Sequence, residues 1–379
     1  MVKVASRLRS SLRRRQGAAI DFNPNGTPPD VYNLYRGFLV KPVEGDCGLF
    51  IEHIEKIIAS DDPPAAKYIL DLFADAVQNP GKKPGVALVL RGEQGVGKGI
   101  FVQYFGKLFE SHFAQVTNPK HLFGGFNARL EDKMILYADE AFFAGNKEHE
   151  GILKGLVTEY IINIERKGKD VVRRKNFIRL IMASNSDWVV PAMGTERRFC
   201  EVDVSDAQRG NHAYFEAISK QMDNGGLEAF MYMLQHRDIT NVNLRDFPHT
   251  EALKDQKIHS MTPFESWLYD SLMQGGFKTT DTLNGNRLIE WGNPVTIDTL
   301  LDSLALASKQ RNLKAHISAT QMGRLIRKYL PYVEKTRLSV SEEGEKLERK
   351  GHILVPSLDE SRKFFDNKMG FKSDWPETQ

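Results

Sequence analysis

An apolar run followed by a glycine-rich turn constrains this chain more than any other feature. Residues 85–91 read Gly-Val-Ala-Leu-Val-Leu-Arg, and residues 92–99 read Gly-Glu-Gln-Gly-Val-Gly-Lys-Gly. A short apolar run bounded by glycine is typical of a buried parallel strand. The turn fits the phosphate-binding template G-x-x-x-x-G-K-[ST] at every position but the last. The sequence therefore predicts a nucleoside triphosphate site in which Gly99 replaces the usual hydroxyl residue.

The backbone of this turn is the physical basis of the prediction. Glycines let it curl so that its N–H groups point at phosphates, and a helix starting near Ile100 adds the partial positive charge of its N-terminus. Lys98 adds a full positive charge. The pattern therefore predicts ATP and Mg²⁺ as cofactors. The predicted nucleotide-binding residues are Gly92, Gln94, Gly95, Val96, Gly97, Lys98, Gly99 and Ile100.

Composition excludes several classes of protein. The chain has 379 residues, enough for two or three domains, and 41% hydrophobic with 27% charged residues is ordinary for a globular protein. No apolar run approaches the roughly 20 residues of a membrane helix, so we expect no membrane partner. Cys47 and Cys200 are far apart in sequence and predict a reducing compartment without a disulfide framework.

The first fifteen residues are strongly basic. They contain six Lys and Arg residues and no acid: Lys3, Arg7, Arg9, Arg13, Arg14 and Arg15. Three interpretations stay open, namely an organellar transit peptide, an arm attracted to nucleic-acid phosphates, and the stub of a linker from a longer polypeptide.

Shifts in pattern divide the chain into five parts. We expect a basic, partly disordered tail or linker at 1–45, a helical lead-in at 46–84, a P-loop ATPase or helicase core at 85–255, a helix and linker at 256–293, and a winged-helix-like domain at 294–379. Apolar strands alternate with amphipathic helices in the third part, which indicates a parallel sheet with helices on its faces. The expected fold class is therefore α/β, with an AAA+-like core between a small helical lead-in and a C-terminal winged-helix-like domain.

The C-terminal part has the order helix, helix, β-ribbon. The helices are expected at 296–308 and 318–330, and the strands at 333–340 and 351–355. Arg324, Arg327 and Lys328 share one face of the second helix, which in winged-helix modules can enter the major groove. A protein-docking domain with a solvated basic face is the open alternative.

Acidic and amide side chains follow two further apolar strands. Asp139 and Glu140 follow the run at 133–138, and Asn185 follows the run at 177–184. A hard cation needs oxygen ligands, so Asp139 is the predicted Mg²⁺ ligand. Glu140 is placed to polarise the water that attacks the γ-phosphate, and Asn185 to hydrogen-bond that water or the phosphate. A solvated acidic turn and an ordinary turn amide are the alternatives.

Paired arginines precede a fourth apolar strand. Arg197 and Arg198 lie directly before residues 199–204. Phosphoryl transfer spreads negative charge over the γ-oxygens, and an arginine from a neighbouring subunit neutralises it. One of the two can instead form a structural ion pair, and the sequence does not distinguish them.

A basic hairpin is expected between the second and third strands. Two strand-like arms within residues 160–175 flank a Lys-Gly-Lys tip. Arg166, Lys167 and Lys169 are the predicted DNA-binding residues, with Arg173 at the base, because such a projection can grip a phosphate backbone. An exposed turn kept soluble by charge is the alternative.

With these motifs in this chain, the sequence resembles superfamily 3 helicases, the compact AAA+-type ATPases of viruses, phages and plasmids. It is most similar to the helicase part of phage and plasmid primase-helicases, over about residues 31–260. The supporting stretches are Asn-Leu-Tyr-Arg-Gly-Phe at 33–38, Gly-Asp-Cys at 45–47, His-Leu-Phe-Gly-Gly-Phe-Asn at 121–127, Ala-Asp-Glu-Ala-Phe at 138–142, Met-Ala-Ser-Asn at 182–185 and Glu-Arg-Arg-Phe at 196–199.

The resemblance implies a hexameric ring with ATP between subunits. Lys98, Asp139, Glu140 and Asn185 would act in cis, with Arg197 or Arg198 as the finger in trans and Lys154 as a further trans candidate. The hairpin would follow single-stranded or forked DNA in a cytoplasmic replication complex, and a primase-polymerase would be absent, on a separate chain or on a missing segment.

The predicted function is accordingly an ATP-dependent replicative DNA helicase. A nucleotide-gated DNA-binding or origin-loading ring that separates no strands is the alternative. Gly99 departs from the template, but Mg²⁺ retains several waters and one can fill the vacancy. The resemblance also implies glycine at this position, so we expect an active ATPase.

Overall fold

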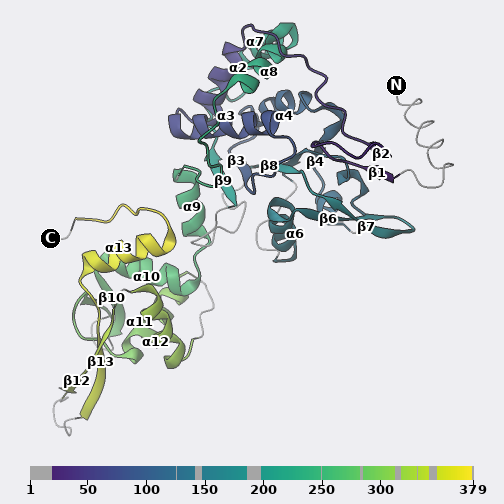
Figure 1. Cartoon of the computed structure of the whole chain (residues 1–379). Coiled ribbons are helices and arrows are strands. Elements are labelled where there is room, and N and C mark those ends of the chain that lie inside the picture. Colours follow the sequence, from purple (N-terminus) through teal and green to yellow (C-terminus); the bar gives the residue numbers. More distant parts are fainter. Residues whose placement is uncertain are drawn as a thin grey trace. The chain divides into compact units, whose positions relative to one another are not determined.

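In the computed structural model, the described residues are 19–124, 126–140, 147–185, 198–248, 250–281, 285–311, 317–330, 332–340 and 348–377 (Figure 1). The chain forms two compact units. Unit 1 is made by the described residues up to Gln256, and unit 2 by those from Lys257 onward. Within the described ranges, no helix combines the length and apolar character needed to cross a membrane.

A five-stranded parallel sheet is the centre of unit 1. Its strands are β3 (Ala87–Arg91), β4 (Phe113–Val116), β5 (Ile135–Asp139), β8 (Arg179–Ser184) and β9 (Phe199–Asp203), in the spatial order β4-β5-β8-β3-β9. The predicted α/β fold with a parallel sheet is confirmed. Because β8 lies between β5 and β3, the carboxyl ends of these three strands meet at one edge of the sheet.

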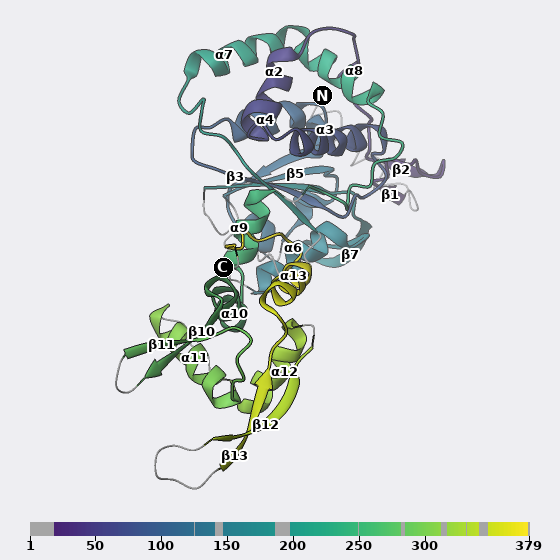
Figure 2. The ribbon, with the colours of Figure 1, turned by 90° about the vertical axis from the view of Figure 1, so that its left-hand side faces the viewer.

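Helices cover both faces of the sheet because its central strands are apolar on both sides. The helical segments described in unit 1 are α2 (Gly48–Glu52), the π-helix η1 (His53–Ile58), α3 (Pro63–Gln78), α4 (Lys98–Lys107), η2 (Glu110–His112), α5 (Lys120–Phe123), η3 (Ala128–Leu130), α6 (Lys147–Thr158), α7 (His212–Gln221), η4 (Met222–Gly226) and α8 (Leu227–His236). Helix α9 (Glu251–His259) contains the boundary between the two units. Figure 2 shows α2, α3, α4, α7 and α8 on one face and α6 on the other.

Each face has its own packed core. On one side, Phe73 of α3 stacks on Phe101 and Phe105 of α4, with ring centroids 5.2 and 3.5 Å apart. On the other side, Leu153 and Leu156 of α6 are buried in one cluster with apolar residues of all the central strands. The side chain of Asp62 caps the first turn of α3, and prolines occupy its first positions, where no N–H is required.

Part of the predicted N-terminal tail is folded. Strands β1 (Ala19–Asp21) and β2 (Val31–Asn33) form a short parallel pair. The adjoining Phe22 is buried, and its ring packs against His112 and Phe177. Burial of this aromatic ring supplies the apolar contact that ties the segment to unit 1. The basic residues of the first fifteen positions lie outside the described residues.

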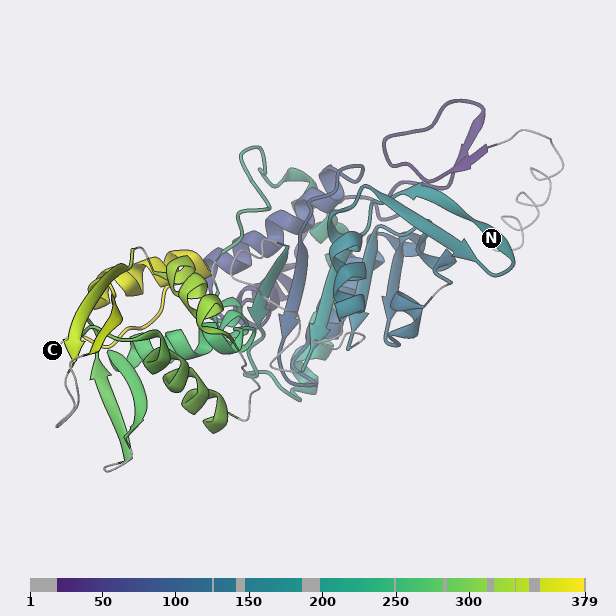
Figure 3. The ribbon, with the colours of Figure 1, turned by 90° about the horizontal axis from the view of Figure 1, so that it is seen from below.

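A β-hairpin follows α6, as the sequence predicts. Strands β6 (Ile161–Arg166) and β7 (Lys169–Lys175) pair antiparallel, and Gly168 at the tip has φ 71°. A positive φ favours glycine, which fits its place in the turn. Figure 3 shows this hairpin projecting beyond the sheet of unit 1.

In its described residues, unit 2 contains four helices and two β-hairpins after the end of α9. The elements are α10 (Pro263–Gln274), β10 (Gly276–Asp281), β11 (Gly285–Glu290), α11 (Ile297–Gln310), α12 (Ala319–Tyr329), β12 (Glu334–Val340), β13 (Glu348–Leu354) and α13 (Leu358–Met369). Trp267, Leu304, Ile326 and Phe365 from the four helices share one buried cluster.

The prediction of a linker up to residue 293 is wrong in its second half. Strands β10 and β11 form a hairpin there, and Phe277 is fully buried between the rings of Trp267 and Trp291. This burial makes the segment part of the core of unit 2. Helix α13 is a further element that the sequence pattern did not reveal.

Candidate functional site

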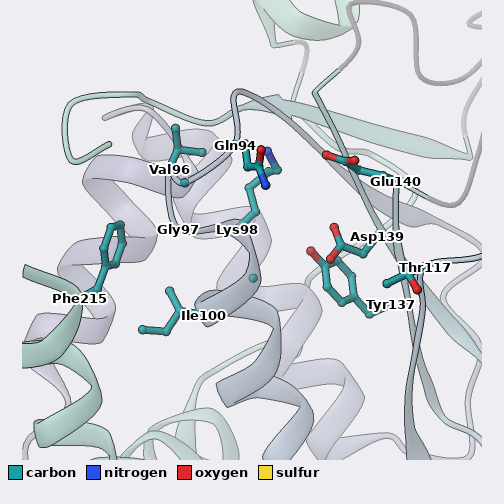
Figure 4. Close-up of a pocket in the computed structure, with 12 residues that line it drawn as sticks. Gln94, Val96, Gly97, Lys98, Ile100, Thr117, Tyr137, Asp139, Glu140 and Phe215 are labelled. Atoms are coloured by element: carbon teal, nitrogen blue, oxygen red, sulfur yellow. The ribbon is translucent and has the colours of Figure 1, made fainter. Parts of the chain in front are cut away.

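The glycine-rich turn lines a pocket of about 490 Å³ at the carboxyl edge of the sheet. Residues 94–100 form one wall, and Thr117, Tyr137, Asp139, Glu140 and Phe215 contribute the rest (Figure 4). The pocket therefore joins the turn after β3 to residues at the ends of β4 and β5. Of the predicted nucleotide-binding residues, all but Gly92 line it.

Local backbone geometry fixes the turn. Strand β3 ends at Arg91 and α4 begins at Lys98, two residues before the predicted start. Gly95 and Gly97 have φ of 83° and 104°, values that L-residues rarely adopt. A Cβ at Gly97 would lie 2.5 Å from the ring of His53 and 2.8 Å from that of Phe215. Glycine at 97 thus satisfies both the dihedral angle and a close approach of two rings.

His53 connects the turn to α7. Its Nε2 lies 3.3 Å from the Gly97 carbonyl oxygen, and its Nδ1 lies 3.1 Å from the Tyr214 hydroxyl. A carbonyl only accepts, so Nε2 carries the proton and Nδ1 accepts from the tyrosine. Burial lowers the pKa of His53 to about 4 although the bond to Gly97 opposes the shift. The imidazole is therefore neutral at physiological pH and fixes the turn from behind.

Lys98 lies over the turn and is largely buried. Its ammonium donates to the carbonyl oxygens of Gly92 and, at 2.9 Å, of Glu93. Burial lowers the pKa of Lys98, while the carboxylates of Glu140 and Asp139 oppose that shift. A partly desolvated cation held by neutral carbonyls is well placed to interact with an incoming anion.

Two neighbouring side chains orient Asp139. The Gln115 amide donates to Asp139 Oδ2 at 3.0 Å from the adjacent strand β4. The Tyr137 hydroxyl also hydrogen-bonds Asp139, and burial followed by the charge and hydrogen bond of this carboxylate raises the pKa of Tyr137. Carboxylates that bind cations are commonly held by such outer partners.

Glu140 adopts an uncommon backbone conformation, with φ 51°. Its N–H donates to the Ala183 carbonyl oxygen at 2.9 Å, which anchors this turn to β8. A non-glycine residue in this region costs about 1–3 kcal/mol and persists where its surroundings determine it. The strain places an exposed carboxylate at the pocket wall.

The remaining predicted catalytic residues lie elsewhere. Asn185 is exposed and follows β8, between the ends of β5 and β3 in strand order, but it does not line the pocket. Arg198 precedes β9, and its carbonyl oxygen accepts from Ala87 N at the start of β3. Arg198 is therefore at the opposite edge of the sheet from the pocket of its own chain. Arg197 lies outside the described residues.

The pocket has two chemically different ends, as Figure 4 shows. Val96, Ile100 and Phe215 give one end an apolar surface, whereas Lys98, Asp139 and Glu140 give the other its charge. The oxygen donors at the charged end suit a hard cation such as Mg²⁺. Within the described residues, no group of three or more His, Cys, Asp or Glu side chains is arranged so that it could hold a metal ion. A cation here would therefore need further oxygens from water, phosphate or hydroxyl groups.

Glu131 anchors both arms of the β6–β7 hairpin. It pairs with Arg166, and its Oε1 accepts from Arg174 Nε at 3.0 Å. Asn127 adds two hydrogen bonds to the backbone of β6, one to the Asn163 carbonyl and one from the Glu165 N–H. Arg166, a predicted DNA-binding residue, is thus engaged within its own chain.

The hairpin tip differs from these anchored arms. Lys167 and Gly168 are exposed, and so is Arg173 on the second arm. The side chain of Lys169 lies outside the description. Of the predicted DNA-binding cations, Lys167 is therefore the one that the structure describes as exposed to solvent at the tip.

Sequence reasoning did not identify the groups that support the pocket. Gln115 and Thr117 belong to or follow the edge strand β4, and His53, Tyr214 and Phe215 come from helices distant in sequence. The strand before Thr117 was itself not predicted, so the rule that a polar residue follows a strand could not be applied to it. The His53–Tyr214 contact has no local signal, because 161 positions separate the two residues.

Comparisons with known proteins show where the chain has relatives. A model described as a family of unknown function (DUF5906) matches residues 90–198. The chain is 30% identical over 128 residues to the DNA primase-polymerase of Nitratiruptor phage NrS-1. That match covers 33% of this chain and 18% of the phage protein.

Solved structures share the fold over a longer stretch. Two apo structures of the NrS-1 C-terminal region, one described as residues 305–718, superpose with TM-scores of 0.69 and 0.68. In both, 18% of residues are identical, and the match covers 89% of this chain and 85% of the other. The chain thus shares its fold with that C-terminal region and is homologous, over a shorter stretch, to part of the phage primase-polymerase.

Proposed function

We propose that this chain is an ATP-driven motor of phage DNA replication that moves on single-stranded DNA and separates strands. The observation that carries the proposal is the pocket in which the glycine turn, Lys98, Asp139 and Glu140 converge at the carboxyl edge of a parallel sheet. Nucleotides commonly bind at this edge in open α/β sheets. A superfamily 3 helicase with an AAA+-like P-loop core is the class that best combines such a pocket with a basic hairpin.

The pocket residues have distinct roles in binding ATP. The N–H groups of the turn and the N-terminus of α4 hold the phosphates, with Lys98 neutralising the terminal ones. Asp139 would hold Mg²⁺ as its carboxylate ligand, and the cation would supply charge neutralisation for the phosphates. The apolar end at Val96, Ile100 and Phe215 accepts the base and sugar.

Hydrolysis needs a water and charge neutralisation. Glu140 accepts a proton from the attacking water, and Asn185 hydrogen-bonds this water or the γ-phosphate. Arg197 or Arg198 comes from a neighbouring subunit, in keeping with the distance of Arg198 from its own pocket. Lys154, half-buried on α6, is a further trans candidate. This arrangement requires an oligomer, and a hexameric ring is the assembly that the helicase class implies.

DNA engages the hairpin in this proposal. Lys167 contacts phosphates at the tip together with Lys169, while Glu131 holds the arm β6 through Arg166. The homologous phage protein is named a DNA primase-polymerase, which supports a role in replication and a primase-polymerase as a partner at forked DNA.

Unit 2 supports a winged-helix-like module. An antiparallel bridge joins Val295, before α11, to Ile353 of β13, so the chain before α11 pairs with the β12–β13 ribbon at one position. Arg324, Arg327 and Lys328 are exposed on α12. DNA binding by this helix and docking of a partner protein both fit such a basic face.

A strand-displacement assay on forked DNA tests the proposal. We expect ATP-dependent displacement by the wild type and losses of about a hundredfold or more for Lys98→Ala and Glu140→Gln. Lys56→Ala, an exposed lysine paired with Asp61, is the matched control and should behave as the wild type. Hydrolysis and DNA binding without displacement would instead favour the nucleotide-gated loading ring. Hydrolysis unaffected by Lys98→Ala would contradict the proposal as a whole.

A further inference from the structure

We infer that Thr117 supplies, from the neighbouring strand, the hydroxyl ligand for Mg²⁺ that the glycine turn lacks at Gly99. This inference rests on the proposed nucleotide site and names an additional residue within it. Thr117 lies directly after β4 and lines the same pocket as Gly99 and Asp139.

Strand register places Thr117 beside Asp139. Strands β4 and β5 run parallel, with Gln115 opposite Tyr137 and Val116 opposite Ala138. Continuing this register by one residue sets Thr117 opposite Asp139. Neighbouring strands are about 4.8 Å apart, so the two side chains are close enough to share one cation.

The contacts of Asp139 confirm that both strands present this face to the pocket. Successive side chains alternate between faces, so Gln115 and Thr117 share one face and Tyr137 and Asp139 share the other strand's equivalent face. Gln115 and Tyr137 both hydrogen-bond Asp139. Figure 4 shows the Thr117 side chain beside Asp139 and Tyr137 at the charged end of the pocket.

The position that normally supplies the hydroxyl is open space. A Cβ built at Gly99 would have no heavy atom within 4 Å, and the backbone there is not in the left-handed region. Position 99 therefore presents no side-chain oxygen to a cation beside Asp139. Mg²⁺ requires near-octahedral oxygen coordination, and Thr117 provides a neutral oxygen across the pocket.

The Thr117 hydroxyl has no competing structural role. It makes no hydrogen bond with any other residue that the structure describes, and the residue is exposed to solvent. A hydroxyl directed into a polar pocket without an internal partner is available to a ligand. A water in place of Thr117 is the competing explanation, and experiment separates the two.

The test measures the Mg²⁺ dependence of binding of a fluorescent ATP analogue, without turnover. Thr117→Val removes the hydroxyl and keeps the shape. We expect it to raise the half-saturating Mg²⁺ concentration roughly tenfold, with binding in EDTA unchanged. Thr117→Ser should retain wild-type behaviour. Gly99→Ser combined with Thr117→Val should restore Mg²⁺ dependence, because serine fits the open space at 99.

Three outcomes would contradict the inference or its basis. Unchanged Mg²⁺ dependence in Thr117→Val would show that water fills the position. Loss of binding in EDTA, or a lowered melting temperature, would show that Thr117 is structural. Failure of the wild type to bind the analogue under any condition would contradict the proposed nucleotide site itself, which is a separate result.

Discussion

The pocket at the glycine turn and the β6–β7 hairpin organise their polar groups in opposite ways. In the pocket, Lys98 and His53 are buried, and carbonyl or hydroxyl groups hold each of them. On the hairpin, Glu131 fixes the arms through Arg166 and Arg174, whereas Lys167 at the tip is exposed. Internal contacts fix the polar groups of the pocket, but on the hairpin they fix only the arms.

This difference corresponds to two kinds of work. A site that stabilises charge in a reaction gains from groups that are already fixed and partly desolvated. A site that follows a flexible, charged polymer gains from long-range attraction and reach, and its exposed charges interact weakly with their own chain. We therefore expect substitutions to act on stability in the pocket and on DNA affinity at the hairpin tip.

Glycine substitution should give the largest contrast between the regions. Gly97→Ala forces an L-residue to φ 104° and places a Cβ 2.5 Å from the ring of His53. We expect a loss of roughly 4 kcal/mol, the sum of the dihedral cost and overpacking. In thermal unfolding this corresponds to a decrease of roughly 10 °C in melting temperature.

The hairpin provides the matched control. Gly168 also has a positive φ, 71°, but a Cβ there meets nothing within 4 Å. Gly168→Ala should therefore cost only about 1–2 kcal/mol, from the dihedral angle alone. Equal losses for the two variants would show that the pocket turn is not packed more tightly than the hairpin.

Acid should weaken the pocket through His53. Its pKa is lowered to about 4 in the folded state from 6.5, so the unfolded chain binds more protons between these values. The contribution of neutral His53 to the free energy of unfolding is fully present above pH 6.5. About 3 kcal/mol of it is lost as the pH falls toward 4. In urea unfolding, the stability difference between wild type and His53→Gln should shrink over this range.

Glu201 gives a control of opposite sign. Burial on β9 raises its pKa to about 8 from 4.5, so the folded chain binds more protons between these values. Its contribution is complete below pH 4.5 and is lost as pH rises toward 8. Glu201→Gln should therefore remove the loss of folding stability at high pH and leave the loss of stability at low pH unchanged. An acid loss that persists in His53→Gln would mean that another group causes it.

How much of the fold could be predicted from the sequence depends on whether an element carries a local pattern of apolar residues. Strand β3 was predictable because Ala87 to Leu90 are buried on both faces and form a continuous apolar run. The hairpin β10–β11 was not, because most of its residues are polar and Phe277 is its fully buried side chain in the described part. Helix α13 was missed for a similar reason, since a few residues such as Phe365 and Met369 carry its burial.

The candidate site shows the same division. Lys98 and the glycines form one continuous motif, so they can be identified from the sequence alone. Gln115 and Thr117 depend on β4 lying beside β5, and no local pattern fixes strand order. Arg166 has the charge of a DNA contact in the sequence, but Glu131, 35 positions earlier, pairs with it in the fold.

The smallest expected effect is at the hairpin tip and is specific for DNA. Lys167→Ala should weaken binding of single-stranded DNA several-fold, about 1 kcal/mol, and lower the salt slope of affinity by about 0.7, the value for one phosphate contact on a single strand. Basal ATP hydrolysis and melting temperature should not change, because Lys167 is exposed and the pocket is built by other elements.

Arg166 makes this prediction sharper, because it is a cation one residue away with a different environment. It is paired with Glu131, so Arg166→Ala should lower the melting temperature and change the salt slope less than Lys167→Ala does. Fluorescence anisotropy with a labelled oligonucleotide at several salt concentrations, together with thermal unfolding, measures both quantities. If Arg166→Ala instead weakened DNA binding more than Lys167→Ala without loss of stability, Arg166 would itself contact DNA. The contrast between the paired arms and the solvated tip would then be wrong.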